Sequence, residues 1–220
     1  MLSVMRMAEL SAAAGIPVAT VKYYMREGIL PAGEHSGPNQ ASYGDSHVRR
    51  LRLIRGLIDV GGLSVAATRR VIDAIDSDHT LAETFDVAQR TVSDEIDPAS
   101  LDPAALHRID DLLAGWHLYP GNPGRLAAAR VLTTFESVGQ SDERGWFRRY
   151  AEAALIVAEA DLDEIDARDD RDSKVETVIV GTVLGDALFA ALRRAAQEHV
   201  TTKRYGAPQS PIAHPQKPRE

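Results

Sequence analysis

The chain has 220 residues, 44% of them hydrophobic, an ordinary share for a globular protein and enough for one large domain or two modest ones. It contains no cysteine, which excludes disulfides, thiolate catalysis, iron–sulfur clusters and cysteine-ligated zinc. The formal net charge is −7, and it is unevenly distributed. Residues 1–76 hold nine Lys and Arg against seven Asp and Glu, whereas the remainder holds 16 against 25, so only the N-terminal part suits a polyanionic partner.

The first 31 residues have the pattern of a helix-turn-helix. A short helix is expected over Met7–Ala14 and ends at Gly15, which can adopt the left-handed conformation of a tight helix stop. Pro17 suits the start of the next helix, because its missing N–H would have no partner there. One of two adjacent tyrosines is expected to pack inward, since neighbouring helical residues point about 100° apart. The side chains of this second helix that are candidates for phosphate and base contacts are Thr20, Lys22, Tyr23 and Tyr24.

A β-hairpin and a basic helix are predicted next. The turn cluster at residues 35–40 lies between two short segments and fits a hairpin wing. Asp45 or Ser46 then caps a helix that has apolar residues at helical spacing and stops at Gly61-Gly62. Its opposite face carries Arg49, Arg50, Arg52 and Arg55.

Two of these arginines, Arg49 and Arg50, are candidates for contacts with a DNA backbone. The alternative is a solvated helix face on which they pair with Asp45 or Asp59. A further helix, capped by Ser64, follows as far as residue 75.

This N-terminal run resembles the MerR family of transcription regulators over about the first third of the chain. The spacing of several motifs agrees together: Gly15-Ile16, residues 20–24 with the doubled tyrosine, residues 28–30, Tyr43, and residues 62–64. The resemblance implies a winged helix-turn-helix. Lys22 stands where the family usually has Arg, which replaces a bidentate fork with a point charge.

The wing departs from the family pattern as well. Ala41 stands where many members carry an Arg, two residues before Tyr43, so His35 or Gln40 is expected to take over part of the phosphate contact. The resemblance further implies a mechanism. A homodimer binds double-stranded promoter DNA, with each recognition helix in a major groove, and bends and untwists the spacer, so that RNA polymerase is an indirect partner.

The rest of the chain is expected to be all helical. Helices are predicted over residues 81–93, 104–115, 125–138, 142–168 and 173–200, with a strong loop signal at 119–124. The fold class is therefore mostly α: a winged helix-turn-helix over 1–76, a helical dimerisation and effector domain over 77–203, and a disordered, proline-rich tail over 204–220.

The dimer contact is expected in the last helix pair. Pro98 and Pro103 interrupt the region where many MerR relatives carry one long dimerisation helix. In the last helix the two glycines each cost about 1 kcal/mol of helix propensity, which close helix packing would offset. The predicted interface stripe consists of Val178, Gly181, Gly185, Leu188 and Leu192. The C-terminal part is similar to the ligand-sensing, dimerising domain of TetR-type regulators.

Aromatic residues at helix ends and in the loop converge, on this prediction, on a pocket for a small apolar effector. They are Trp116, Tyr119, Trp146, Phe147 and Tyr150. The alternative is that these rings only fill the core. The acidic run over 159–172 is interpreted as a solvated helix end, and no histidine or carboxylate spacing predicts a metal or a cofactor.

The sequence therefore predicts a homodimeric DNA-binding regulator that is not an enzyme. A cytoplasmic location without membrane contact is expected, because no signal peptide is evident and no apolar run approaches the roughly 20 residues of a membrane span. Two alternatives remain: a ligand-independent regulator whose C-terminal helices only dimerise or contact a protein partner, and a helical enzyme carrying a DNA module.

Overall fold

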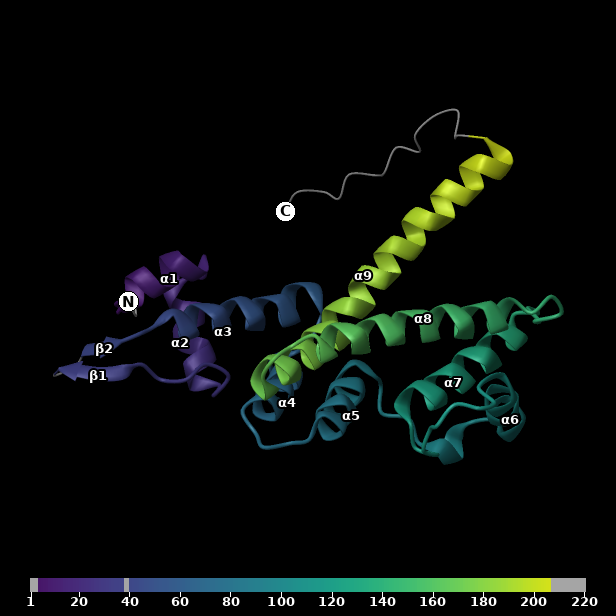
Figure 1. Cartoon of the computed structure of the whole chain (residues 1–220), viewed down its shortest axis with the longest axis horizontal. Coiled ribbons are helices and arrows are strands. Elements are labelled where there is room, and N and C mark those ends of the chain that lie inside the picture. The colour runs from purple at the N-terminus through teal and green to yellow at the C-terminus, as the bar shows by residue number, and fades with distance from the viewer. Residues whose placement is uncertain (1–3, 38–39, 207–220) are drawn as a thin grey trace.

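The computed structural model describes residues 4–37 and 40–206, and it is mostly helical with one small antiparallel sheet (Figure 1). The N-terminal part contains a helix-turn-helix, a hairpin and two further helices, as the sequence predicts. Its elements are α1 (Met7–Ala14), α2 (Val18–Arg26), β1 (Glu34–Gly37), β2 (Gln40–Ser42), α3 (Asp45–Arg55), the π-helical turn η1 (Gly56–Val60) and α4 (Val65–Ile75).

The C-terminal part is all helical in the residues described. Its elements are α5 (Leu81–Val92), the 3-10 turn η2 (Pro98–Ser100), α6 (Pro103–Leu112), α7 (Pro123–Ser137), α8 (Trp146–Asp166) and α9 (Arg171–Tyr205). The mostly α fold class is confirmed. The tail predicted over 204–220 begins too early, because α9 continues through Tyr205; residues 207–220 lie outside the described chain.

Local capping explains where several of these helices begin and end. Gly15 ends α1 in the left-handed conformation (φ 67°), and its N–H donates to the carbonyls of Ser11 and Ala12. The Ser64 hydroxyl accepts the Ala67 N–H at the start of α4, as predicted. The predicted cap of α3 is wrong: Gly44 is the N-cap residue and Asp45 already lies in the first turn, where its negative charge suits the helix dipole.

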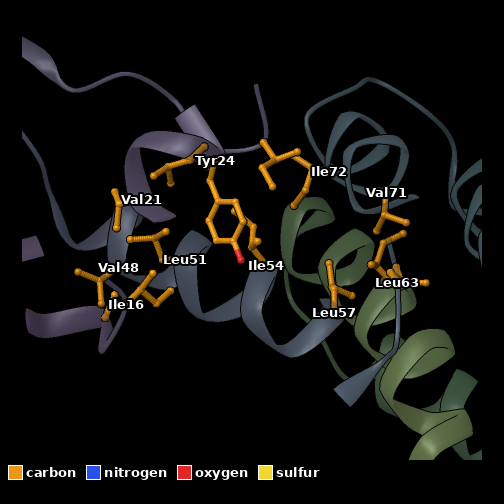
Figure 2. Packing of buried hydrophobic residues seen from close by; sticks show 14 of the residues in the cluster. Ile16, Val21, Tyr24, Val48, Leu51, Ile54, Leu57, Leu63, Val71 and Ile72 are labelled. Carbon is orange, nitrogen blue, oxygen red and sulfur yellow. The ribbon is translucent and has the colours of Figure 1, made fainter. Parts of the chain in front are cut away.

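The main hydrophobic core lies inside the N-terminal part. Leu10, Val21, Leu51, Ile54 and Leu57 are fully buried there, and Figure 2 shows Val21, Leu51 and Ile54 packed around the Tyr24 ring. Burial of one such side chain contributes about 1.5–3 kcal/mol. This core fixes α1, α2 and α3 relative to one another and so determines which face of α2 stays exposed.

The same core continues across residue 76. Ala88 of α5 and Ile179 and Val183 of α9 are buried in it. Helix α9 lies against η1 so closely that a Cβ built on Gly61 would stand 2.3 Å from Val183 Cγ1. The two predicted domains therefore share one core, in which α9 takes part.

The outer portions of α8 and α9 have few partners within the chain. Ile165 is the one buried residue of α8, and in α9 every residue from Leu188 to Tyr205 is exposed. Figure 1 shows the C-terminal half of α9 projecting away from the body. A small second core, built by Ala105, Ile109, Ala129 and Leu132, holds α6 against α7.

Helix α9 contradicts the expectation that no apolar run of the chain approaches the length of a membrane span. By length and composition it could cross a membrane, since one 18-residue window has a mean hydropathy of 1.8 with 22% of it buried in the protein. A single helix of this kind is weak evidence for a membrane span. The helix already packs part of its length into a protein core, and an apolar helix face that meets a protein partner has the same composition.

Candidate nucleic-acid interface and C-terminal cavity

Two arginines brace the turn between α1 and α2. The Arg52 Nη2 donates to the Ala13 carbonyl at 3.2 Å, and the Arg55 Nη1 donates to the Gly15 carbonyl at 3.2 Å. Carbonyls at a helix C-terminus lack partners within the helix, and cations there also complement the helix dipole. Arg52 and Arg55 of α3 thus stabilise the turn between α1 and α2.

Helix α2 presents a cationic face to solvent. Lys22 is exposed and makes no hydrogen bond or ion pair with a described residue. Arg26, one helical turn further on, is exposed, and its guanidinium lies 5.4 Å from the Tyr23 ring centroid. Thr20 is half-buried beside them. The sequence analysis missed Arg26, although its spacing of four from Lys22 places both on one face.

The two tyrosines of α2 have different environments. Tyr24 is only 9% exposed and belongs to the core, which argues against a DNA contact through its ring; the contact stays a prediction. Burial raises the pKa of the Tyr24 hydroxyl above its ordinary value, and the negative charge of Asp59 adds to the shift. Tyr23 is half-buried and lies next to Lys22 in sequence, so it is the tyrosine whose hydroxyl is available to a phosphate.

The predicted wing is a hairpin in which Glu34 pairs with Ser42 and His35 with Ala41. His35 and Gln40 are exposed on it. Tyr43 is 6% exposed, and its backbone exchanges hydrogen bonds of 2.8 and 2.9 Å with Met5. Tyr43 therefore anchors the hairpin to the core, which argues against a DNA contact through its ring; the contact stays a prediction.

The two candidate arginines of α3 also separate. Arg49 is exposed and has no hydrogen-bonded or charged partner among the described residues. Arg50 is bound by both guanidinium nitrogens to Asp76, at 3.2 and 2.5 Å, and its side chain is 19% exposed. Arg50 therefore ties α3 to the end of α4, an engagement that competes with a DNA contact, and its contact with the DNA backbone stays a prediction. Its partner is Asp76 rather than Asp45 or Asp59.

A helix-turn-helix with an exposed cationic second helix and an adjoining hairpin defines a winged helix-turn-helix DNA-binding protein. The family description "MerR HTH family regulatory protein" matches residues 5–75. The fold is similar to that of the crystal structure of the "putative transcriptional regulator SCO5550" from Streptomyces coelicolor A3(2), with a TM-score of 0.71. The two sequences are 32% identical, and the match covers 94% of this chain and 100% of that chain. No curated protein matches the chain significantly.

The chain belongs to the MerR family and is a DNA-binding transcription regulator. Both comparisons are with regulators rather than with enzymes. Neither supports the expected resemblance of the C-terminal part to TetR-type regulators, which stays a prediction.

A large, open, mainly apolar cavity lies between α5, α6, α7, α8 and α9, with a volume of about 1110 Å³. Four of the five predicted effector residues line it: Trp116, Trp146, Phe147 and Tyr150. The fifth, Tyr119, lies outside; its hydroxyl donates to Asp86 at 2.6 Å and accepts from Arg90 at 3.1 Å. Phe135 completes the aromatic wall, edge-on to Trp146 with ring centroids 5.3 Å apart.

The predicted dimer stripe is divided between two environments. Val178 is 1% exposed within its own chain, which argues against a direct contact with a second copy; its place in the interface stays a prediction. Gly181 and Gly185 line the cavity, and a Cβ built on either would meet no atom within 4 Å, so no helix within residues 4–37 and 40–206 crosses there. Leu188 and Leu192 are 61% and 58% exposed and remain available to a partner.

Proposed function

We propose that this regulator acts as a homodimer on promoter DNA in the cytoplasm and responds to a small-molecule effector. Each α2 enters a major groove and contacts DNA through Lys22, Tyr23 and Arg26. His35 and Gln40 of the wing and Arg49 of α3 contact flanking phosphates. RNA polymerase is affected indirectly, through the conformation of the promoter.

One observation carries the DNA-binding surface: the exposed cations of α2 make no hydrogen bond or ion pair with a described residue, whereas neighbouring arginines of α3 are engaged. Lys22 and Arg49 are unpaired among the described residues, while Arg50, Arg52 and Arg55 bind the protein itself. Cations without partners favour phosphate binding through the release of counterions. The rest of the chain is acidic, which favours an orientation that keeps it away from the duplex.

The exposed end of α9 supports the homodimer. Most helices in proteins are stabilised by packing an apolar face against other elements. Among the described residues the end of α9 has few partners, such as Arg193 against Tyr150 of α8, yet it carries large, exposed apolar side chains, among them Leu188 and Leu192. A second copy that buries this stripe against its own would supply the missing contacts.

The route of α9 supports control by an effector. Gly185 and Phe189 of this helix line the cavity. Ile179 and Val183, one to two turns earlier in the same helix, are buried in the main core of the N-terminal part. A ligand that binds more tightly when α9 is in one position than in another would stabilise that position of α9. Because α9 packs against η1, the shift would also move η1 and α3.

The test begins with fragments of the source genome selected on the full-length protein and sequenced. We expect fragments with two inverted half-sites about one helical turn apart, and a dimer by sedimentation equilibrium. A protein that stays monomeric and does not retain double-stranded DNA at low salt would contradict the proposal.

The alternative is a ligand-independent regulator with the same DNA-binding surface, and the cavity is the observation against it. Thermal unfolding in the presence of a metabolite library distinguishes the two. A specific ligand at 100 times its Kd adds about 2.7 kcal/mol of stability. A library without any stabilising compound, together with intact DNA binding, would favour the alternative.

A further inference from the structure

We propose that Arg69 of α4 is a positioning residue for DNA recognition, which holds the end of α2 in the orientation that discriminates between DNA sequences. This inference rests on the proposed contact of α2 with DNA. It assigns a role to a side chain that does not itself touch the duplex. The guanidinium of Arg69 reaches Glu27, the residue that directly follows α2 and caps it.

Arg69 binds two polar groups of Glu27. Its Nη2 donates to the main-chain carbonyl of Glu27 and lies 3.4 Å from a carboxylate oxygen of the same residue. Carbonyls at a helix C-terminus lack partners within the helix, and a cation placed there complements the helix dipole. Among the described residues, this is the only hydrogen-bonded contact that a side chain of α4 makes with α2 or its cap. Arg69 therefore links the two helices.

The other contacts of α2 leave its tilt to be set at this end. Tyr24, Ile29 and Leu30 are buried and determine how deeply α2 and the residues after it lie in the core. Arg52 and Arg55 bind the turn before α2, at the opposite end of the helix. Apolar packing is not directional, whereas a hydrogen bond to a carbonyl prefers one geometry. The contact with Arg69 is therefore the one that resists a tilt of α2 on its buried side.

Helix α4 is a firm support for this contact. Val71 and Ile72 of α4 are buried in the main core, together with Ala88 of α5 and Ile179 of α9. The position of α4 therefore depends on both parts of the chain. The side chain of Arg69 is 47% exposed, so it extends from this packed helix along the surface to the end of α2. Groups that read base edges must be held in register with the duplex, and a displaced end of α2 would lose that register.

Arg69→Ala in the full-length protein tests the proposal on two DNA fragments: one recovered by the genomic selection, and a scrambled fragment of the same length and composition. We expect the ratio of the two affinities to fall about tenfold, a usual effect of one mismatched base pair. Loss of a phosphate contact would instead weaken both complexes alike and reduce the slope of log K against log salt. An unchanged ratio of affinities, with or without a reduced slope, would overturn the proposal.

Two further variants separate positioning from charge. Arg70→Ala removes the same charge from the next residue of α4, whose side chain is exposed and makes no hydrogen bond or ion pair with a described residue, so the ratio should stay as it is. Arg69→Ala also frees the carboxylate of Glu27, which would repel phosphates. Adding Glu27→Gln removes that charge but restores no donor to the carbonyl, so the ratio should stay low. Full recovery of the ratio in the double variant would overturn the proposal, because neutralising Glu27 would then be the whole role of Arg69.

Hydrogen exchange shows whether the end of α2 is the part that changes. Arg69→Ala should speed the exchange of backbone amides at the end of α2 and leave α3 as protected as in the wild type. If the alanine variant unfolds, Arg69→Met takes its place, because it keeps the apolar stem of the side chain without a donor, and the same fall in the ratio is expected. Unchanged exchange at the end of α2 would contradict a positioning role.

Lys22→Ala separates this inference from the proposed function. If Lys22→Ala weakens DNA binding while Arg69→Ala keeps the ratio of affinities, only the role of Arg69 is wrong. If neither substitution affects DNA binding, α2 is not the surface that contacts DNA, and the proposed function fails together with this inference.

Discussion

Neighbouring residues of this protein with the same chemistry have different roles, and burial decides which role each has. Tyr23 and Tyr24 are adjacent, but one is half-exposed beside Arg26 and the other is part of the core. Arg49 and Arg50 are also adjacent and differ in exposure and contacts. Asp76 binds the less exposed Arg50, whereas exposed Arg49 has no carboxylate partner among the described residues. Sequence reasoning foresaw that one tyrosine would turn inward, but which one depends on how α2 is rotated against α3.

Lys22→Ala should weaken binding to all DNA sequences. Each phosphate contact contributes about 0.9 to the slope of log K against log salt, so losing one per protomer should reduce the slope of a dimer by about 2. Salt titrations by fluorescence anisotropy measure this. Arg149→Ala, at an exposed position on α8, removes the same charge far from α2 and should leave the slope as it is. An unchanged slope for Lys22→Ala would rule out its phosphate contact.

Arg50→Ala should act on stability rather than on DNA. Its ion pair with Asp76 is partly exposed, so its loss should cost about 1 kcal/mol of the free energy of unfolding. Urea denaturation measures the cost, and the salt dependence of DNA binding should keep its slope. A reduced slope with unchanged stability would place Arg50 on the DNA after all.

Tyr24→Ala should be among the most destabilising single changes in the DNA-binding part. Removing a large buried aromatic leaves a cavity and costs about 3–5 kcal/mol. Tyr23→Phe is the matched change at the exposed neighbour: it should leave the melting temperature nearly unchanged and weaken DNA binding. A stable Tyr24→Ala protein would mean that the ring is not part of the core.

At the scale of elements, the parts predicted well are those whose signals are local. Gly15 fixes the end of α1, and Ser64 fixes the start of α4. The parts predicted poorly depend on pairs distant in sequence. Arg50 meets Asp76 across 26 residues, and Tyr119 meets Asp86 across 33, and no periodicity encodes either pair.

The N-terminal and C-terminal parts approach each other most closely at Gly61, which directly follows η1 and packs against α9. No other described glycine has so close a contact between the two parts. A Cβ on Gly61 would stand 2.3 Å from Val183 Cγ1 and 2.7 Å from the Leu57 carbonyl oxygen. The first residue of the same turn, Gly56, has a roomy environment, because its Cβ would lie 3.6 Å from Leu184. Five residues apart, the two glycines thus offer a matched comparison.

Gly61→Ala should destabilise the protein by about 1–3 kcal/mol, the usual cost of overpacking, and should displace α9 from η1. Gly56→Ala should stabilise it by about 0.5–1 kcal/mol, because its helical conformation suits alanine better than glycine. Thermal and urea unfolding measure both. Equal effects of the two substitutions would contradict close packing at Gly61.

At the scale of the whole molecule, charge and apolar surface are distributed separately. The N-terminal part has a small excess of basic charge, with exposed Lys22, Arg26 and Arg49 on α2 and α3, and the excess acidic charge lies in the remainder. The largest exposed apolar surfaces lie on α8 and α9. The sequence predicted this division from charge counts and from the apolar last helix. It did not predict that α9 joins the N-terminal core, because the apolar residues of a long helix do not indicate which partner buries each of them.

Replacing Leu188 and Leu192 by Glu should convert the protein to a monomer in sedimentation experiments. Binding to a two-half-site fragment should then weaken by about 100-fold or more, because the second half-site no longer binds intramolecularly. Gln197→Glu adds a charge to the opposite face of the same helix and should leave the dimer intact. A dimer that survives both leucine replacements would place the interface elsewhere, with α8 as the next candidate.

The share that α9 has in the N-terminal core limits how this regulator can be recombined. A fragment cut at residue 76 would leave behind Ile179 and Val183 and expose the side chains they cover, so it should be prone to aggregate. A chimera that joins this DNA-binding part to the effector-binding part of another protein would need to retain the first half of α9, because that half packs into the N-terminal core. Exchange of modules in such proteins is therefore constrained by a helix encoded about a hundred residues after the module it supports.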